Sequence, residues 1–531
     1  MASLKKSPSF FLAGIFFCLI FLSSSSSAKD AFVTASIAEP ANLLPLFASD
    51  TASAQVSGLI FNGLVKYDKD LKLVGDLASD WQVRGDGQQI TFYLRRDVLW
   101  QDGVAFSAED VEFTFKSLTD PAIPTPYGGD FEKIKSVTVR DPYTVEVLYK
   151  EPFSPGLASW AMGILPKHLL QNENLMNTDF SRHPVGTGPY ILKKWKAGET
   201  IELAANPRYF EGAPGLDRYV LRIIPDQATA FLELQNEGLD FAGLSPLQFK
   251  KQTDTGFFKS AYRKYKIPSF GYVYIGYNLS KPLFSDPKVR RAVGLAINKC
   301  EIIDVTLLGQ GRVATGPFLP GTWAYNDNVK ESVFDPDEAR RLLGEAGWHD
   351  TDGDGLLDKN GKKFSFVILT NQGNDERKMA CEMIQKRLRD IGIKMDIHVV
   401  EWRTFLKEFI DKRKFDAVLL AWQLSRDPDI FDIFHSSKKS PGQFNFVSYQ
   451  NPEVDRLLEE GRRLFPEEER AKIYKRVHEI ISQDEPYTFL YVPESLVAVH
   501  ARFEGLEPSP AGLTHNFIRW RVPKGSEKYA S

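Results

Sequence analysis

The chain has 531 residues, of which 43% are hydrophobic, 25% charged and 12% aromatic. This composition is typical of a globular protein and excludes a collagen-like, coiled-coil or wholly disordered chain. A net charge of −3 provides no global field for nucleic acid, and three cysteines exclude a disulfide scaffold. At roughly 100–200 residues per domain, the length allows several domain-sized units.

The N-terminus has the three-part pattern of a secretory signal peptide. Two lysines precede an uncharged apolar run from Phe10 to Leu22, and small residues then lead to Ala28. The run is too short to cross a bilayer as a helix, which takes about 20 residues. We therefore expect residues 1–28 to be cleaved near Ala28, which leaves a soluble mature protein exported to the periplasm.

The opening of the mature chain, residues 32–105, is rich in strand patterns and is expected to be a more antiparallel unit. Asp141-Pro-Tyr predicts a turn between strands at 136–140 and 144–149. Capping residues then predict helices at several later points. These helix starts are Ser107, Asp286, Asp335, Asn451 and Pro466.

Residues 364–422 alternate between strand and helix patterns. Apolar strands at 364–369, 393–399 and 415–422 are separated by helical segments at 374–391 and 404–412. This β-α-β-α-β order predicts a doubly wound parallel sheet. Ligands bind such sheets beyond the carboxyl ends of the strands, so the loop from Gln423 to Asp429 is the first site candidate.

Several segments then carry a resemblance to a known family. The chain resembles the extracellular solute-binding proteins of family 5, which are the peptide-, oligopeptide- and nickel-binding receptors of ABC importers. The similarity runs from about residue 32 to 522 and is specific to the family rather than to a ligand. It is carried by residues 42–67, 76–115, 184–190 (PVGTGPY), 275–278 (IGYN) and 289–297 (VRRAVGLAI).

The resemblance implies an α/β, two-lobed periplasmic-binding-protein type II fold with a hinge and an extra inserted subdomain. Two crossovers, near Lys266–Tyr277 and Leu490–Val499, would form the hinge, and hinges of this kind close two lobes around a ligand. The implied division is lobe I at 29–68, 180–268 and 492–531, the inserted subdomain at 69–179, and lobe II at 269–491.

The function implied by the resemblance is capture of a solute in the cleft between the lobes and its delivery to an ABC permease, whose ATPase subunits hydrolyse ATP. An oligopeptide is the favoured ligand, and the protein is expected to be monomeric, without enzymatic activity and without nucleic-acid partners. A non-peptide or anionic solute, or a metal chelate, is the alternative. An exported hydrolase and a holdase-like or sensor protein are the rival classes, and no catalytic motif supports the hydrolase.

One departure from the family pattern concerns the amine anchor. Peptide-binding members usually place an Asp three residues before the Asp of an Asp-Pro pair, where it binds the amino terminus of the ligand. In this chain Asp427-Pro428 is the pair, and the anchor position is Leu424. Asp427 or Asp429 could replace the anchor, whereas Arg426 adds a positive charge that suits an acidic or non-peptide ligand.

Further candidates for the ligand site follow from the same comparison. Trp422 is expected to line the cleft as an aromatic platform, with a core position in the sheet as the alternative. His435 is expected to be a satisfied surface histidine. The other candidate ligand-binding residues are Gln423, Ser425, Asp50, Thr51, Tyr277, Asn278, Trp323, Phe444 and Asn445.

A separate acidic segment resembles a calcium-binding loop. Asp350, Asp352, Asp354 and Asp358 occupy relative positions 1, 3, 5 and 9, with a glycine at position 6. Position 12 should be a bidentate Glu, and it is Gly361. The alternative is an acidic hairpin turn without a cation, and no other cofactor is expected.

Two cysteines, Cys300 and Cys381, remain after cleavage of the signal peptide. Export permits a disulfide between them, and two buried free thiols are the alternative. The eight histidines show no metal-ligand spacing. The nearest approach to a metalloprotease motif begins at His478, but Ser482 stands where the second histidine should be.

Overall fold

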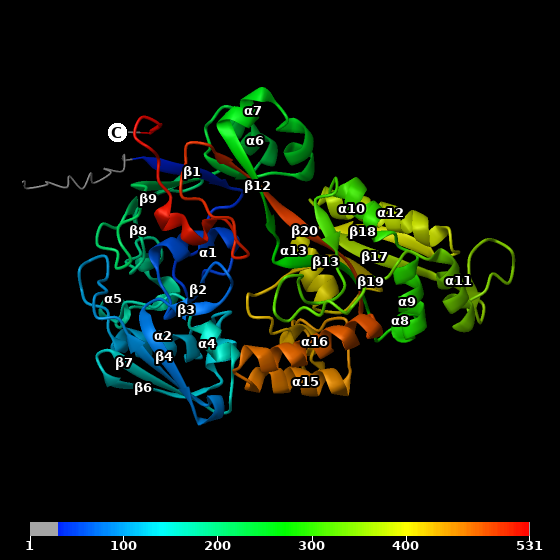
Figure 1. Cartoon of the computed structure of the whole chain (residues 1–531). Coiled ribbons are helices and arrows are strands. Elements are labelled where there is room, and N and C mark those ends of the chain that lie inside the picture. Colours follow the sequence, from blue (N-terminus) through cyan, green and yellow to red (C-terminus); the bar gives the residue numbers. More distant parts are fainter. Residues whose placement is uncertain (1–29, 530–531) are drawn as a thin grey trace, which may run out of the picture.

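The computed structural model describes residues 30–529, without the side chains of Asp86 and Arg403 (Figure 1). The expected signal peptide, residues 1–28, lies outside the described residues. Within the described part, no helix is both long and apolar enough to cross a membrane.

One continuous sheet, of twelve strands among residues 30–529, connects two lobes. Its longest strand is β20 (Tyr487–His500), which crosses the middle of the molecule in Figure 1. The first half of β20 pairs with β13 (Gly271–Tyr277) and the second half with β12 (Tyr262–Pro268). Because Ser269 and Phe270 alone separate β12 from β13, the two chain crossings lie side by side as a hinge.

Lobe I contains the N-terminal strand β1 (Ala31–Ser36) and the last part of the chain. β1 runs parallel to β10 (Arg218–Ile223), so the expectation of a more antiparallel opening is wrong at this strand. The parallel partner comes from far along the chain, where no local pattern could indicate it. The sheet of lobe I continues with β11 (Phe241–Gly243), β9 (Thr200–Ala205) and β8 (Tyr190–Lys196).

Lobe II confirms the predicted β-α-β-α-β unit. The strands β17 (Ser365–Asn371) and β18 (Lys394–Val400) pair in parallel, and β17 also pairs in parallel with β19 (Ala417–Gln423). The helix α12 (Asp375–Arg389) connects the first two strands. The second connection contains the short helix α13 (Trp402–Thr404), which continues into a π-helix at 405–410.

The hinge-side sheet of lobe II is buried on both faces. Along β13, Tyr272 and Tyr274 belong to one hydrophobic cluster, whereas Val273 and Ile275 belong to another. This alternation follows from the two-residue repeat of a strand. The sheet therefore has a face that carries Trp422 and an opposite face that packs against α12.

A four-stranded antiparallel sheet lies between residues 78 and 149, within the range expected for the inserted subdomain. The predicted hairpin is confirmed as β6 (Ile134–Asp141) and β7 (Thr144–Tyr149). A smaller hairpin, β2 (Val65–Tyr67) and β3 (Leu73–Gly75), precedes the sheet. The other elements of this region are β4 (Ala78–Arg84), β5 (Gln89–Leu94), α2 (Ala108–Thr119), α3 (Gly128–Phe131), α4 (Pro155–Ser159) and α5 (Lys167–Leu170).

All five predicted helix starts are confirmed, because each of these residues is the N-cap of a helix. Asp286, Asp335 and Asn451 each accept a hydrogen bond from a backbone N–H of the first helical turn. Besides α12 and α13, the α-helices outside the inserted region in the described chain are α1 (Thr51–Ile60), α6 (Gln227–Gln235), α7 (Gly256–Ala261), α8 (Pro282–Ser285), α9 (Pro287–Leu295), α10 (Lys299–Thr306), α11 (Pro336–Glu345), α14 (Phe431–Phe434), α15 (Pro452–Arg463) and α16 (Glu467–Asp484). Three short strands complete the elements: β14 (Gly311–Val313), β15 (Asp358–Lys359) and β16 (Lys362–Lys363).

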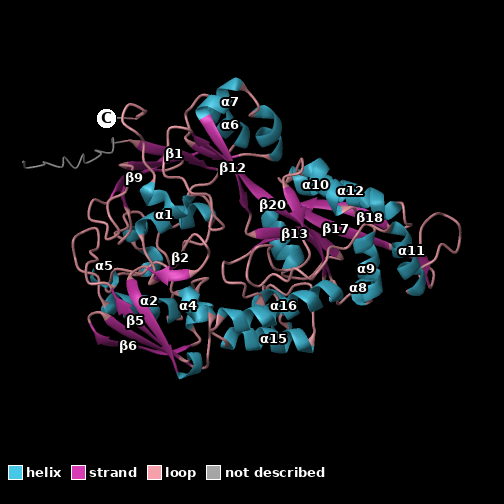
Figure 2. Cartoon of the chain, viewed as in Figure 1, coloured by secondary structure: helices cyan, strands magenta, loops and turns pink. Residues whose placement is uncertain are grey.

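The helices α15 and α16 of lobe II contact the inserted region, beside α4 in Figure 2. The backbone N–H of Ser154 donates to the carbonyl of Arg462 at 2.7 Å. The guanidinium of Arg462 lies 5.2 Å from the centre of the Phe153 ring. These contacts join the two sides of the cleft, so the structure is a closed arrangement.

Cys300 is exposed and Cys381 is buried, and both are free thiols. The disulfide expected as one alternative is therefore not formed, and the burial expected for Cys300 is wrong. Cys300 lies at the second position of α10, on a helix surface that faces solvent.

Candidate functional site

A cavity of about 680 Å³ lies where the loop after β19 faces the β2–β3 hairpin. Lobe II supplies the loop Gln423–Ile430 and parts of the segment from Phe318 to Asp327. The opposite side supplies the hairpin residues Asp70–Lys72. This volume is within the range of small-molecule sites, about 300–1,000 Å³. We call it the front cavity.

Aromatic rings form one wall of the front cavity. The Trp422 indole Nε1 donates to the Tyr487 hydroxyl at 3.3 Å, and the Trp422 ring lies 5.5 Å from the Phe444 ring. Phe444 keeps 53% of its surface exposed. Trp323 lies with its ring centre 5.1 Å from the guanidinium of Arg470. The cavity therefore presents apolar surface that can cover the side chains of a bound ligand.

The two acidic residues that could have replaced the amine anchor are already paired. Arg470 donates two hydrogen bonds of 2.9 Å to the carboxylate of Asp427. Arg462 Nε donates to Asp429 at 2.8 Å. Burial raises the pKa of Asp429 to about 6, although Arg462 opposes this shift. Each carboxylate already pairs with an arginine and would have to share its oxygens with a ligand amine, so replacement of the anchor by Asp427 or Asp429 stays a prediction.

Leu424, at the usual anchor position, is part of the apolar wall. Its side chain is partly buried and packs against the hydrophobic cluster that contains Tyr272 and Phe446. Its backbone N–H donates to the carbonyl of Phe270 at 2.8 Å. The loop therefore offers no carboxylate at this position.

Arg426 reaches from lobe II to the other side of the cleft. Its Nη2 donates to the carbonyl of Ala511 at 3.3 Å, and its guanidinium lies 5.5 Å from the centre of the Tyr67 ring. Partial desolvation lowers the pKa of Arg426. Arg426 also lines a cavity of about 580 Å³ within lobe I, so it lies between two spaces that a ligand could enter.

Three carboxylates that line the front cavity have no ion-pair partner among residues 30–529. They are Asp70, Asp327 and Glu467. Lys72, on the same hairpin as Asp70, is likewise without an ion pair in the described chain. The front cavity thus keeps both signs of charge available for a ligand.

Seven of the predicted site residues line the front cavity together with Trp422. These residues are Gln423, Leu424, Ser425, Arg426, Asp427, Trp323 and Phe444. The hydroxyl of Ser425 donates to the carbonyl of Asp427 and helps to close the turn. The loop after β19, which the sheet topology predicted as the first site candidate, therefore lines the front cavity.

Five predicted site residues do not line the front cavity. Asp50 caps α1 by accepting from the Ser53 N–H at 2.8 Å, and Thr51 is the exposed first residue of that helix. The other three are buried in lobe II, where their polar atoms bond to other residues. Tyr277 shares a hydrogen bond with Thr488, Asn278 donates to the Phe415 carbonyl, and Asn445 donates to the Tyr449 carbonyl.

The histidine predictions have different outcomes. His435 is buried rather than on the surface, and its ring stacks on Phe431 at 4.0 Å. His478 accepts a hydrogen bond from the Asn326 N–H through Nδ1, and burial lowers its pKa to about 4. A neutral, buried His478 fits a structural role and not a metalloprotease helix.

The β2–β3 hairpin is one part of the site that the sequence did not predict, as are Asp327 and Glu467. Asp70–Lys72 lie at its turn, and Leu71 has a φ of 63°. Asp68 organises this turn by accepting from the N–H groups of Asp70 and Lys72 at 2.9 Å. The turn signal was readable from the sequence, but its position opposite the loop of lobe II was not.

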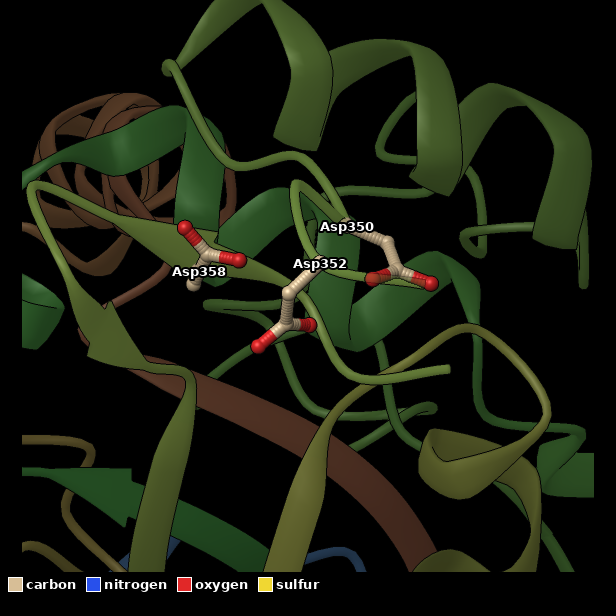
Figure 3. Close-up of side chains that lie close together, drawn as sticks. All are labelled: Asp350, Asp352 and Asp358. Atoms are coloured by element: carbon tan, nitrogen blue, oxygen red, sulfur yellow. The ribbon is translucent and has the colours of Figure 1, made fainter. Parts of the chain in front are cut away.

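The acidic loop at 350–358 lies away from the front cavity. Carboxylate oxygens of Asp350, Asp352 and Asp358 lie within 4.8 Å of one another (Figure 3). Lys363 Nζ lies 2.6 Å from Asp352 and 3.0 Å from Asp354. This ammonium group offsets part of the acidic charge of the loop. Calcium binding stays a prediction.

Comparison with known proteins places this geometry in a family. Residues 72–444 match the family described as bacterial extracellular solute-binding proteins, family 5 Middle. The chain belongs to the family 5 solute-binding proteins. Among its relatives is the oligopeptide-binding protein AppA of Bacillus subtilis, 34% identical over 94% of this chain and 95% of AppA.

Solved structures of family 5 proteins share the fold. AppA of Bacillus subtilis, in complex with a nonapeptide, has a TM-score of 0.79 at 33% identity, covering 94% of this chain and 100% of AppA. NikZ from Campylobacter jejuni, in complex with Ni(L-His), has a TM-score of 0.80 at 30% identity, covering 93% of this chain and 99% of NikZ. DppA from Helicobacter pylori, in complex with the peptide STSA, has a TM-score of 0.77 at 27% identity, covering 94% and 99%. The protein therefore has the two-lobed type II fold of substrate-binding proteins.

Proposed function

We propose that this family 5 protein captures a peptide in the front cavity and delivers it to the permease of an ABC importer in the periplasm. The observation that supports this best is a cavity of about 680 Å³ bounded by both sides of a closed cleft. Its relatives AppA and DppA are described with bound peptides. The partner subunits supply ATP hydrolysis, and the receptor acts as a monomer.

The charges of the front cavity indicate how a peptide would be held without the usual anchor. An ammonium group that leaves water needs a partner, because desolvating it alone costs several kcal/mol. Asp70, Asp327 and Glu467 are the available carboxylates. Arg426 is available for a terminal carboxylate or an acidic side chain. Closure of the two lobes would supply these partners and expel water together.

An anionic solute or a metal chelate is the second candidate ligand. Leu424 in place of an acidic anchor favours it, as does Arg426, which forms no ion pair among residues 30–529. The relative NikZ is described with Ni(L-His). Catalysis is not part of either proposal, so a bound peptide should be recovered intact.

The first experiment is mass spectrometry of the small molecules released when the mature protein is denatured. Intact peptides would support the peptide proposal, whereas a single chelate or non-peptide mass would replace it with the second candidate. Truncated products of an added peptide would contradict the assignment as a receptor without catalysis.

Calorimetric titration of refolded, ligand-free protein with the recovered peptides tests the position of the site. Trp323→Ala should weaken binding at least about tenfold, because a large apolar contact is lost. Trp402→Ala is the matched control, since Trp402 is 49% exposed and does not line the front cavity. Equal losses of peptide affinity in the two variants would mean that the peptide binds outside the front cavity. Loss of peptide uptake in a deletion strain tests delivery to the importer.

A further inference from the structure

A second cavity, of about 320 Å³, lies at the hinge. Strands β13 and β20 and the end of β19 line it, together with the start of α12. Lobe I contributes Leu244 and Pro246, so both lobes bound this space. We call it the hinge cavity. It meets the front cavity only at Trp422 and Gln423, where β19 ends.

The hinge cavity lies mainly on the other face of the lobe II sheet, although Tyr272 from the front-cavity side also lines it. Its lining residues Val273, Leu307 and Tyr491 belong to the hydrophobic cluster on the α12 side. The front cavity instead adjoins the cluster that includes Trp422 and Leu424. The end of β19 therefore separates two different binding spaces.

Four buried polar atoms around the hinge cavity lack a hydrogen-bond partner in the described chain. They are Arg377 Nε, Gln310 Oε1, Glu494 Oε2 and the hydroxyl oxygen of Tyr272. Gln310 is only 2% exposed. Buried groups of this kind are normally satisfied in proteins, so several around one cavity indicate a bound polar molecule.

Two of these acceptors, Gln310 Oε1 and Glu494 Oε2, belong to residues that are joined through their backbones. The N–H of Glu494 donates to the backbone carbonyl of Gln310 at 3.1 Å, which holds the two residues side by side. Gln310 Nε2 donates to the Leu308 carbonyl at 2.9 Å, and this bond leaves Oε1 as the free end of the amide. Glu494 Oε2 lies 3.7 Å from Lys266 Nζ, beyond hydrogen-bond distance.

Arg377 supplies the opposite charge. Its Nη1 donates to Asn371 Oδ1 at 2.6 Å, and it forms no ion pair with any carboxylate of residues 30–529. Desolvation lowers the pKa of Arg377. A half-buried guanidinium with a buried, free Nε–H is suited to a carboxylate, which accepts strong hydrogen bonds from arginine.

We propose that the hinge cavity is a second ligand site, which binds a small zwitterion of amino-acid size. The carboxylate of the ligand accepts from Arg377 Nε, and its ammonium group donates to Gln310 Oε1 and Glu494 Oε2. Apolar residues such as Leu244, Leu307 and Leu496 line the remaining space and cover a side chain. Glu376, also at the cavity, favours a ligand with a positive group over a simple anion.

The experiment is calorimetric titration of refolded, ligand-free protein with a panel of free L-amino acids. We expect saturable 1:1 binding of at least one of them. In Arg377→Met that amino acid should bind at least tenfold more weakly, and its analogues lacking either the amine or the carboxylate should bind poorly to the wild type. Lys378→Met is the matched control, because Lys378 is the exposed neighbouring cation on α12 and does not line the cavity.

The position of the site is tested by competition with a peptide. A peptide that saturates the front cavity should leave amino-acid binding unchanged, and Arg377→Met should leave peptide binding unchanged. Competition would place one end of the peptide in the hinge cavity and would overturn the separate site. No binding in the whole panel, or equal binding to Arg377→Met, would show that water alone fills the cavity. These outcomes do not depend on whether Trp323→Ala weakens peptide binding, so the two proposals can fail separately.

Discussion

The ligand loop shows how single residues can have the expected position and a different role. Asp427 and Asp429 follow β19 as the sequence predicted, but they bind Arg470 and Arg462 of the helices behind them. Removal of one member of a buried ion pair is more costly than its net contribution, because the other charge stays buried. These carboxylates therefore hold the loop through their arginine partners.

Arg470→Met tests this role at the residue scale. We expect a loss of about 3 kcal/mol in the free energy of unfolding, because the carboxylate of Asp427 loses the cation with which it pairs in the described chain. Urea denaturation measures it. Arg476→Met, on the same helix but in exposed pairs with Glu453 and Glu479, should change stability by about 0.5 kcal/mol or less. Equal effects of the two substitutions would contradict the argument, and Asp427→Leu added to Arg470→Met should restore part of the loss.

At the scale of elements, the α15–α16 pair is the part of lobe II that contacts the inserted region. Phe465, between the two helices, packs on Gly87, where an added Cβ would lie 2.2 Å from its ring. Arg462 belongs to this contact and also binds Asp429 in the wall of the front cavity. The contact that closes the cleft is thus connected to the ligand loop through one arginine.

Phe465→Ala should therefore weaken closure. We expect the release rate of a bound peptide to rise about tenfold, since the lost contact stabilises only the closed state. Stopped-flow displacement measures the rate, and small-angle scattering should show a larger radius of gyration for the complex. Phe257→Ala in lobe I, a partly exposed ring away from the cleft, is the control. An unchanged release rate would mean that this contact does not limit opening.

At the scale of the whole molecule, the two ends of the described chain, residues 30–529, are held together in lobe I. Asp30 is buried and accepts hydrogen bonds from the Arg502 guanidinium and from the N–H groups of Lys528 and Tyr529. Arg502 also binds Asp240, beside the hinge strand β20. The first described residue is therefore already part of the folded core.

The position of Asp30 gives a prediction for export. Cleavage after Ala28 would leave Lys29 as the first residue and keep Asp30 in its place. We expect the intact mass of protein purified from the periplasm to match residues 29–531. A chain produced without residues 1–28 should have the same melting temperature as the protein purified from the periplasm. A mature protein that begins after Asp30, or one that retains the leader, would contradict this prediction.

The sequence alone determined the features that depend on neighbouring residues. Helix caps at Asp286, Asp335 and Asn451, the strand–helix alternation of 364–422 and the family segments are local patterns, and local hydrogen bonds or periodic burial produce them. The loop after β19 could also be predicted as a site, because parallel sheets bind ligands beyond their strand ends.

Only the tertiary structure decided which of these residues is free to bind. Asp427 and Arg470 lie far apart in the chain, as do Tyr277 and Thr488, and their pairing depends on how whole elements pack. The same is true of the hairpin at Asp70–Lys72 and of the hinge cavity, which residues from both lobes enclose. The residue type specifies what a side chain can bind. The packing of distant segments determines whether that side chain already bonds to another residue of the protein.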